Sequence, residues 1–206
     1  MAASASADSL FHLADQWFDR ARTSLGETLP CSQGCSSCCI GPFPVTQLDV
    51  LELRRGLALL PDEQRTAIQT RATEQVAELE QAYPVLQTDP SLDTWKDDAI
   101  DHLVAQFGDR PCPALQSDGS CGLYAFRPLT CRTMGIPTET DGVVQGACTV
   151  QTSVPIVRLS ATLRGEEDEI AKQEGEALDV LRQVRPSMGE EVLLPYGFLP
   201  ERATGR

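Results

Sequence analysis

Eight cysteines fall into two groups in this chain, and their spacing is typical of a metal-binding protein. Four lie within nine residues and four follow later: Cys31, Cys35, Cys38 and Cys39, then Cys112, Cys121, Cys131 and Cys148. A soft cation such as zinc needs several thiolates converging at about 2.3 Å, and short intervals between cysteines close such loops at low entropic cost. We therefore predict that all eight cysteines are metal ligands.

Disulfide bonds are the main alternative for an even number of cysteines. The chain begins Met-Ala-Ala-Ser-Ala-Ser, without the basic and apolar regions of a secretion signal. We therefore expect a cytoplasmic protein in a reducing compartment, where disulfides are rare. Cys38 and Cys39 are adjacent, and a bond between neighbouring cysteines is strained. Both observations favour metal-bound thiolates.

The sequence leaves the division of the thiolates into sites open. Adjacent residues of an extended stretch point to opposite sides, so Cys38 and Cys39 can serve two sites, or one can be a bridging or spare thiolate. Two four-cysteine sites would use all eight. Zinc and an iron–sulfur cluster both accept tetrahedral thiolate. The Cys112-Pro113 step, similar to that after ferredoxin ligands, and the crowded first group tilt the choice toward the cluster.

Two arginines flank Cys131 and can balance the negative charge of a thiolate centre. Arg127 precedes this cysteine by four residues and Arg132 follows it directly. Burying an anionic centre is costly without nearby positive charge or hydrogen-bond donors. We therefore predict that both guanidinium groups support the metal site, the alternative being surface ion pairs with carboxylates.

The charge of the chain argues against two classes of partner. The 206 residues contain 17 Lys and Arg against 30 Asp and Glu, a net charge of −13. A phosphate backbone or an anionic membrane surface would be repelled, and no apolar run reaches the length of a membrane span. We expect a metal ion or cluster as the bound partner, and neither nucleic acid nor a membrane.

Apolar periodicity predicts helices around the cysteines. Residues recurring at intervals of three and four mark helices over about 9–25, from 47 to Pro61, over 62–83, around 95–107 and over 166–184. Thr46 is a suitable cap for the second of these, with Asp49 three residues on. The Asp118-Gly119 and Asp141-Gly142 pairs predict hairpin turns, and the tail beyond Pro186 is predicted to lie irregularly over the surface.

These elements predict a mainly α protein: a helical bundle with a cysteine-rich metal-binding region carried on loops and short β-hairpins. We expect a single domain over residues 1–206. Its cysteine-rich region, 31–148, is flanked by the helices at 9–25 and 166–184.

The cysteine pattern resembles a known family. Cys31-x₃-Cys35-x₂-Cys38-Cys39 is similar to the signature of the CxxCxxCC, or YkgJ-type, family, although its first interval is one residue longer. The later motifs follow in the family's order: Cys112-Pro113-x-Leu115, Gly119-Ser120-Cys121, Tyr124-x-x-Arg127-Pro128-x-x-Cys131-Arg132 and Cys148. The resemblance covers about residues 31–148 and implies a bacterial cytoplasmic protein that chelates zinc or an iron–sulfur cluster.

Three functions are weighed on this basis. The first is metal binding through the cysteines, without an assigned activity. The second is a metal-dependent enzyme, because Cys31-x₃-Cys35-x₂-Cys38 has the spacing of the radical S-adenosylmethionine motif, and a related cysteine region occurs in flagellin lysine methylation proteins. However, the chain shows no alternating strands and helices for the corresponding barrel. The third is a thiol-based metal carrier or redox partner.

Overall fold

The protein is mainly helical, as the sequence predicts. The computed structural model describes residues 2–26, 29, 34–140, 142–146, 148, 150, 156–185 and 189–201. They form two compact units, one drawn from Met1–Cys38 and Leu129–Pro186, the other from Cys39–Pro128 and Ser187–Arg206. Each unit combines segments far apart in the sequence, and the single domain expected over 1–206 stays a prediction.

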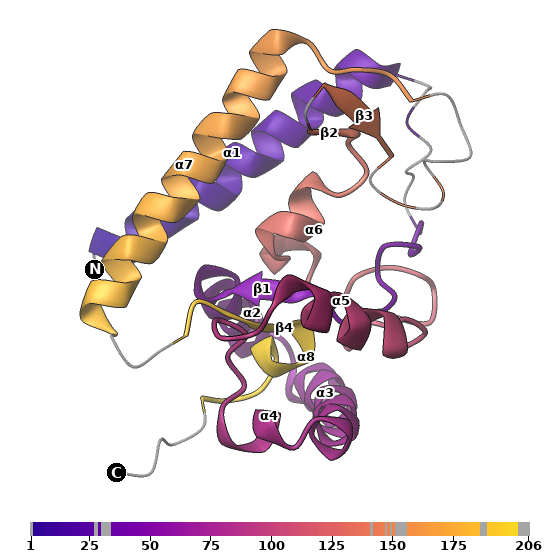
Figure 1. The fold of residues 1–206 in the computed structure, drawn as a ribbon, viewed down its shortest axis with the longest axis vertical. Helices are drawn as coiled ribbons and strands as arrows, with labels where there is room; N and C mark the ends of the chain where they lie inside the picture. The colour runs from indigo at the N-terminus through magenta and orange to yellow at the C-terminus, as the bar shows by residue number, and fades with distance from the viewer. Residues whose placement is uncertain are drawn as a thin grey trace. The chain divides into compact units, whose positions relative to one another are not determined.

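Two long helices, α1 (Ala2–Leu25) and α7 (Ala161–Val184), form the frame of the first unit. They lie side by side (Figure 1). The indole N–H of Trp17, which is fully buried, donates to the carbonyl of Leu163 at 2.8 Å. Arg20 and Glu166 form an ion pair at 2.7 Å on the exposed side. Burial of apolar side chains along α1 is the main force that holds this pair together.

Both helices of the frame are longer than predicted. Helix α1 begins at Ala2, within an alanine-rich start that favours helix by propensity but lacks an apolar stripe. Helix α7 begins at Ala161, where the hydroxyl of Ser160 accepts the N–H of Leu163 at 3.3 Å. Ser160 is a standard N-cap residue type. The acidic residues Glu166 to Glu169 also suit the first turn of a helix, and the predicted helix therefore began at Glu166 instead of Ala161.

The first unit also contains a short helix and a hairpin. Helix α6 (Leu129–Thr133) packs on α1, and β2 (Thr138–Thr140) pairs antiparallel with β3 (Val143–Gln145). The hairpin confirms the turn predicted around Gly142, which has a φ of 76°. Asp141, the other half of that turn, lies outside the described residues.

The second unit has three main helices, α2 (Gln47–Leu59), α3 (Asp62–Ala82) and α5 (Asp97–Gln106). Each matches a predicted helix. Thr46 and Asp49 cap α2 reciprocally, with backbone-to-side-chain distances of 3.4 and 3.1 Å. Two further short helical elements of this unit are α4 (Val85–Thr88) and the 3₁₀ helix η2 (Tyr124–Phe126).

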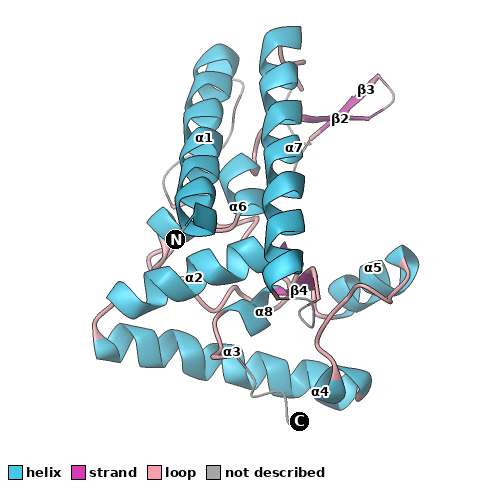
Figure 2. Cartoon of the chain, turned by 90° about the vertical axis from the view of Figure 1, so that its left-hand side faces the viewer, coloured by secondary structure: helices cyan, strands magenta, loops and turns pink. Residues whose placement is uncertain are grey.

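The prediction of an irregular tail beyond Pro186 is wrong for residues 189–201, the part of the tail that the structure describes. Strand β4 (Glu191–Leu193) pairs antiparallel with β1 (Pro44–Thr46), and α8 (Leu194–Gly197) contacts both α2 and α3 and lies between them (Figure 2). Leu193 and Phe198 are buried in the core. Proline and glycine suggested an irregular tail, but Pro195 stands in the first turn of α8, where proline is well tolerated.

No helix within the described part of the chain is long and apolar enough to cross a membrane.

Candidate metal centre

The two compact units divide the described cysteines between them. None of the seven cysteines that the structure describes forms a disulfide, and each is partly buried. The first unit holds Cys35, Cys38, Cys131 and Cys148, and the second holds Cys39, Cys112 and Cys121. Cys31, the first predicted ligand, lies outside the described residues. The adjacent pair Cys38 and Cys39 is therefore split at the boundary between the two units.

In the second unit, a short antiparallel contact sets Cys39 opposite Cys112. Ile40 and Pro111 form a β-bridge. On one side of this bridge, the N–H of Cys112 donates to the carbonyl of Cys39 at 2.7 Å. On the other side, the N–H of Gly41 donates to the carbonyl of Arg110 at 2.6 Å. Cross-strand neighbours place their side chains on the same face. The pairing thus brings one cysteine of the early group next to one of the late group.

The Cys112 thiol lies in a turn that directs backbone donors at it. The N–H of Leu115 closes the turn on the Cys112 carbonyl at 2.9 Å. Burial raises the pKa of the Cys112 thiol to about 12, and nearby Cys121 adds to the rise. Hydrogen bonds from the N–H groups of Ala114 and Leu115, together with the Arg71 charge, act in the opposite direction. A thiolate here has donors ready, but it forms only when something replaces its proton, as a bound cation does.

Cys121 is placed by the predicted Asp-Gly turn. It forms a β-bridge with Leu115, flanked by hydrogen bonds from Gly122 to Ala114 and from Gln116 to Ser120, both 2.8 Å. Gly119 has a φ of 82°, a conformation that other residues seldom adopt. This short hairpin returns the chain so that Cys121 approaches Cys112.

Two side chains of α3 that were not predicted from the sequence hold the Cys112 loop, the segment from Pro111 to Pro113. Arg71 Nε donates to the carbonyl of Pro113 at 2.8 Å, and Gln75 Nε2 donates to that of Pro111 at 2.7 Å. In the sequence, the only indication of their role is that both residues border the apolar stripe of this helix. Their partners are backbone carbonyls, which no sequence motif reveals.

The two arginines predicted to support the site make other contacts in the structure. Arg127 Nη1 donates to the carbonyl of Tyr124 at 2.9 Å, and its guanidinium lies 4.0 Å from the centre of that ring. Arg132 is buried, pairs with Asp15 of α1 and lies 5.0 Å from the centre of the Phe11 ring. Arg132 thus ties α6, which carries Cys131, to α1. Their role toward a metal stays a prediction.

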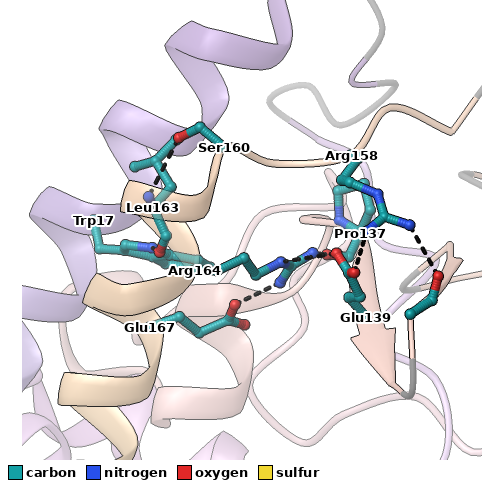
Figure 3. Close-up of polar contacts among 9 residues, drawn as sticks. Trp17, Pro137, Glu139, Arg158, Ser160, Leu163, Arg164 and Glu167 are labelled. Atoms are coloured by element: carbon teal, nitrogen blue, oxygen red, sulfur yellow. Dashed lines mark hydrogen bonds and ion pairs between the residues drawn. The ribbon is translucent and has the colours of Figure 1, made fainter.

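In the first unit, a cluster of charges holds the hairpin that precedes Cys148. Arg164 of α7 reaches between Glu167 and the carbonyl of Pro137, while Arg158 binds Glu139 and the carbonyl of Gly142 (Figure 3). Among the described residues, the buried Nε of Arg164 has no hydrogen-bond partner, and it lies 3.9 Å from a Glu139 oxygen. The cluster fixes β2 against the start of α7.

The donor chemistry of the second unit fits a thiophilic metal, although no complete cage is formed. Cys112 and Cys121 lie near each other, and backbone N–H groups point at the first of these sulfurs. Within the described ranges, no group of three or more Cys, His, Asp or Glu side chains is gathered closely enough to hold an ion. The ligand roles of the eight cysteines therefore stay a prediction, with Cys39, Cys112 and Cys121 as the best-placed members.

Comparison with known proteins places the chain in a family. It matches no curated protein and no solved structure. The family model of CxxCxxCC, described as "Putative zinc- or iron-chelating domain", matches residues 30–149, more than half of the chain. That span includes both cysteine groups and the resemblance seen in their spacing. The chain therefore belongs to the CxxCxxCC family.

Proposed function

We propose that this protein binds zinc or an iron–sulfur centre through its cysteine thiolates. The observation that carries the proposal is the Cys112 loop, where two backbone N–H groups face one sulfur and a second cysteine lies nearby. N–H donors to sulfur stabilise metal-bound thiolate. Cys39, Cys112 and Cys121 would be the ligands from the second unit, and Cys35, Cys38, Cys131 and Cys148 those from the first, together with Cys31.

The bound centre would supply positive charge that keeps these sulfurs as thiolates. The residues around them would orient the sulfurs and limit the access of water. Between the two candidate centres, the Cys112-Pro113 step favours an iron–sulfur cluster, which would be sheltered in a reducing, cytoplasmic setting. Zinc requires the same thiolate chemistry, so the measurement must distinguish them.

Anaerobic purification followed by metal analysis and a visible spectrum tests this proposal. Stoichiometric iron with broad visible absorption would indicate a cluster, and stoichiometric zinc in a colourless protein would indicate the alternative. Cys112→Ser should lower the bound metal substantially, whereas Ser117→Ala, an exposed change in the same hairpin, should not. A protein that holds neither metal, even after reduction and reconstitution, would refute the function.

A further inference from the structure

We propose that Arg71 and Gln75 of α3 position Cys112 for metal binding, and that Arg71 also supplies charge that offsets the thiolate centre. This inference rests on the proposed function, because it assigns roles to residues around that same site.

The Cys112 loop offers its carbonyls as points of attachment. Cys112 stands between Pro111 and Pro113, and proline has no N–H to donate. The carbonyls of both prolines are bound from α3, one by Gln75 at 2.7 Å and the other by Arg71 at 2.8 Å. The two contacts lie on either side of the cysteine, so together they fix both the position and the direction of the loop.

The helix that carries these side chains is a firm support. Residues four apart lie on the same face of a helix, so Arg71 and Gln75 act on the loop together. The neighbouring stripe of α3 is buried in the core, with Ile68, Ala72, Val76 and Leu79 at most 4% exposed. The helix is therefore held in place by the core and does not follow the loop. Movement of the loop away from α3 would break both hydrogen bonds.

Arg71 differs from Gln75 in carrying a positive charge close to the thiol. A centre with several thiolates is anionic, and burying such charge requires compensation nearby. The hydrogen bond to the carbonyl of Pro113 holds the guanidinium of Arg71 beside the residue that directly follows Cys112. The role expected from the sequence for Arg127 and Arg132 is therefore assigned, at this cysteine, to an arginine of α3.

Three substitutions separate positioning from charge. Arg71→Gln removes the charge, Arg71→Lys keeps the charge but loses the planar donor group, and Gln75→Ala removes one contact with the loop. The matched control is Gln69→Ala. Gln69 also lies on α3 and also donates to a backbone carbonyl, that of Phe198 at 3.4 Å, but this carbonyl belongs to the C-terminal segment.

The measurement is a titration of the full-length, reduced and metal-free protein with Co²⁺, followed by competition with Zn²⁺. The thiolate-to-cobalt charge-transfer absorption band reports ligation by sulfur directly. Circular dichroism of the same samples reports the helix content. We expect Arg71→Gln to weaken zinc binding about 10- to 100-fold and Gln75→Ala about 10-fold, as for other residues that orient ligands. Arg71→Lys should fall between wild type and Arg71→Gln, and Gln69→Ala should match wild type.

The outcomes distinguish this inference from the proposed function. Absence of cobalt or zinc binding by the wild type would refute the function itself. Wild-type affinity in both Arg71→Gln and Gln75→Ala would overturn the positioning role, and equal losses in Arg71→Gln and Arg71→Lys would overturn the charge role. If Arg71→Gln loses its helical signal, Arg71→Lys and Gln75→Ala test the positioning role instead, since each retains one of the two side chains that can bind the loop from α3.

Discussion

Single residues in this protein are held in environments that oppose their charged forms. Cys112 is one example, since burial disfavours its thiolate. Glu191 is another: burial, then the negative charges of Asp93 and Glu190, raise the pKa of its carboxyl group. The Asp93 charge lies close because this carboxylate accepts the N–H groups of both Glu190 and Glu191, at 2.9 and 3.2 Å. The contact that anchors β4 thus places two carboxylates together.

Replacement of Glu191 by Gln should stabilise the protein at neutral pH. The pKa of Glu191 is higher in the folded than in the unfolded state, so ionisation above that pKa weakens the fold. Below the unfolded pKa, about 4.3, the carboxyl is protonated in both states and the penalty vanishes. Because solvent screens this partly exposed group, we expect Glu191→Gln to gain less than about 1 kcal/mol at pH 7 and nothing at pH 3.5.

Urea denaturation of wild type and Glu191→Gln at several pH values measures this gain. Glu74→Gln, at an exposed position of α3, is the control for the loss of a carboxylate outside this contact. A gain that persists unchanged at pH 3.5 would show that charge is not its cause.

Among the secondary-structure elements, the contact of η2 with α2 depends on a glycine, which has no side chain beyond its hydrogen atom. Gly56 lies within α2, and a Cβ placed there would come 2.6 Å from Cβ and Cγ of Phe126. The guanidinium of Arg55 lies 5.2 Å from the centre of the Phe126 ring and is itself paired with the buried Glu52 at 2.8 Å. Glycine at this position lets the segment that follows Cys121 pack closely on the helix.

Gly56→Ala should destabilise the protein, although alanine favours helix. Overpacking against Phe126 costs about 1 to 3 kcal/mol, which outweighs a propensity gain of at most about 1 kcal/mol. The control is Gly175→Ala in α7, where a new Cβ would meet nothing within 4 Å. It should stabilise by about 0.5 to 1 kcal/mol. Free energies of unfolding from urea denaturation measure both, and equal effects in the two variants would contradict the packing argument.

Local patterns sufficed for most helices but not for long-range pairing. Helices α2, α3 and α5 were predictable because apolar residues recur at helical spacing and Thr46 supplies a cap. The pairing of β4 with β1 joins distant segments of three residues each, too short for an alternating pattern to be read. The buried Val192 and Leu193 were the available signal, and the nearby proline and glycine obscured it.

The candidate site shows the same limit. The cysteines and the Asp118-Gly119 turn could be identified because residue type and spacing mark them. Arg71 and Gln75 could not, since their function depends on carbonyls that approach α3 only in the folded chain. The division of the cysteines between units was equally hidden, because it follows from tertiary contacts rather than from spacing.

For the molecule as a whole, the cysteine segments of the second unit and the long helices of the first differ in what holds them in place. In the second unit the cysteine segments contact each other through isolated β-bridges, Ile40 with Pro111 and Leu115 with Cys121. The long helices of the first unit instead pack through a buried apolar face that includes Trp17 and Ala21. Metal bound by the thiolates would therefore stabilise the loops far more than the helices.

Removal of the metal should loosen the cysteine segments while leaving α1 and α7 largely protected. With a chelator under reducing conditions, the amides of Gly41, Cys112 and Gly122 should exchange hydrogen at least about tenfold faster, since their hydrogen bonds belong to isolated bridges rather than to a helix or an extended sheet. Amides in the middle of α7 should change little. Hydrogen exchange followed by mass spectrometry, with the metal-loaded protein as reference, makes this comparison. Equal acceleration in α7 and in the loops would mean that the metal supports the entire fold, and no change in either would mean that these sulfurs do not hold it.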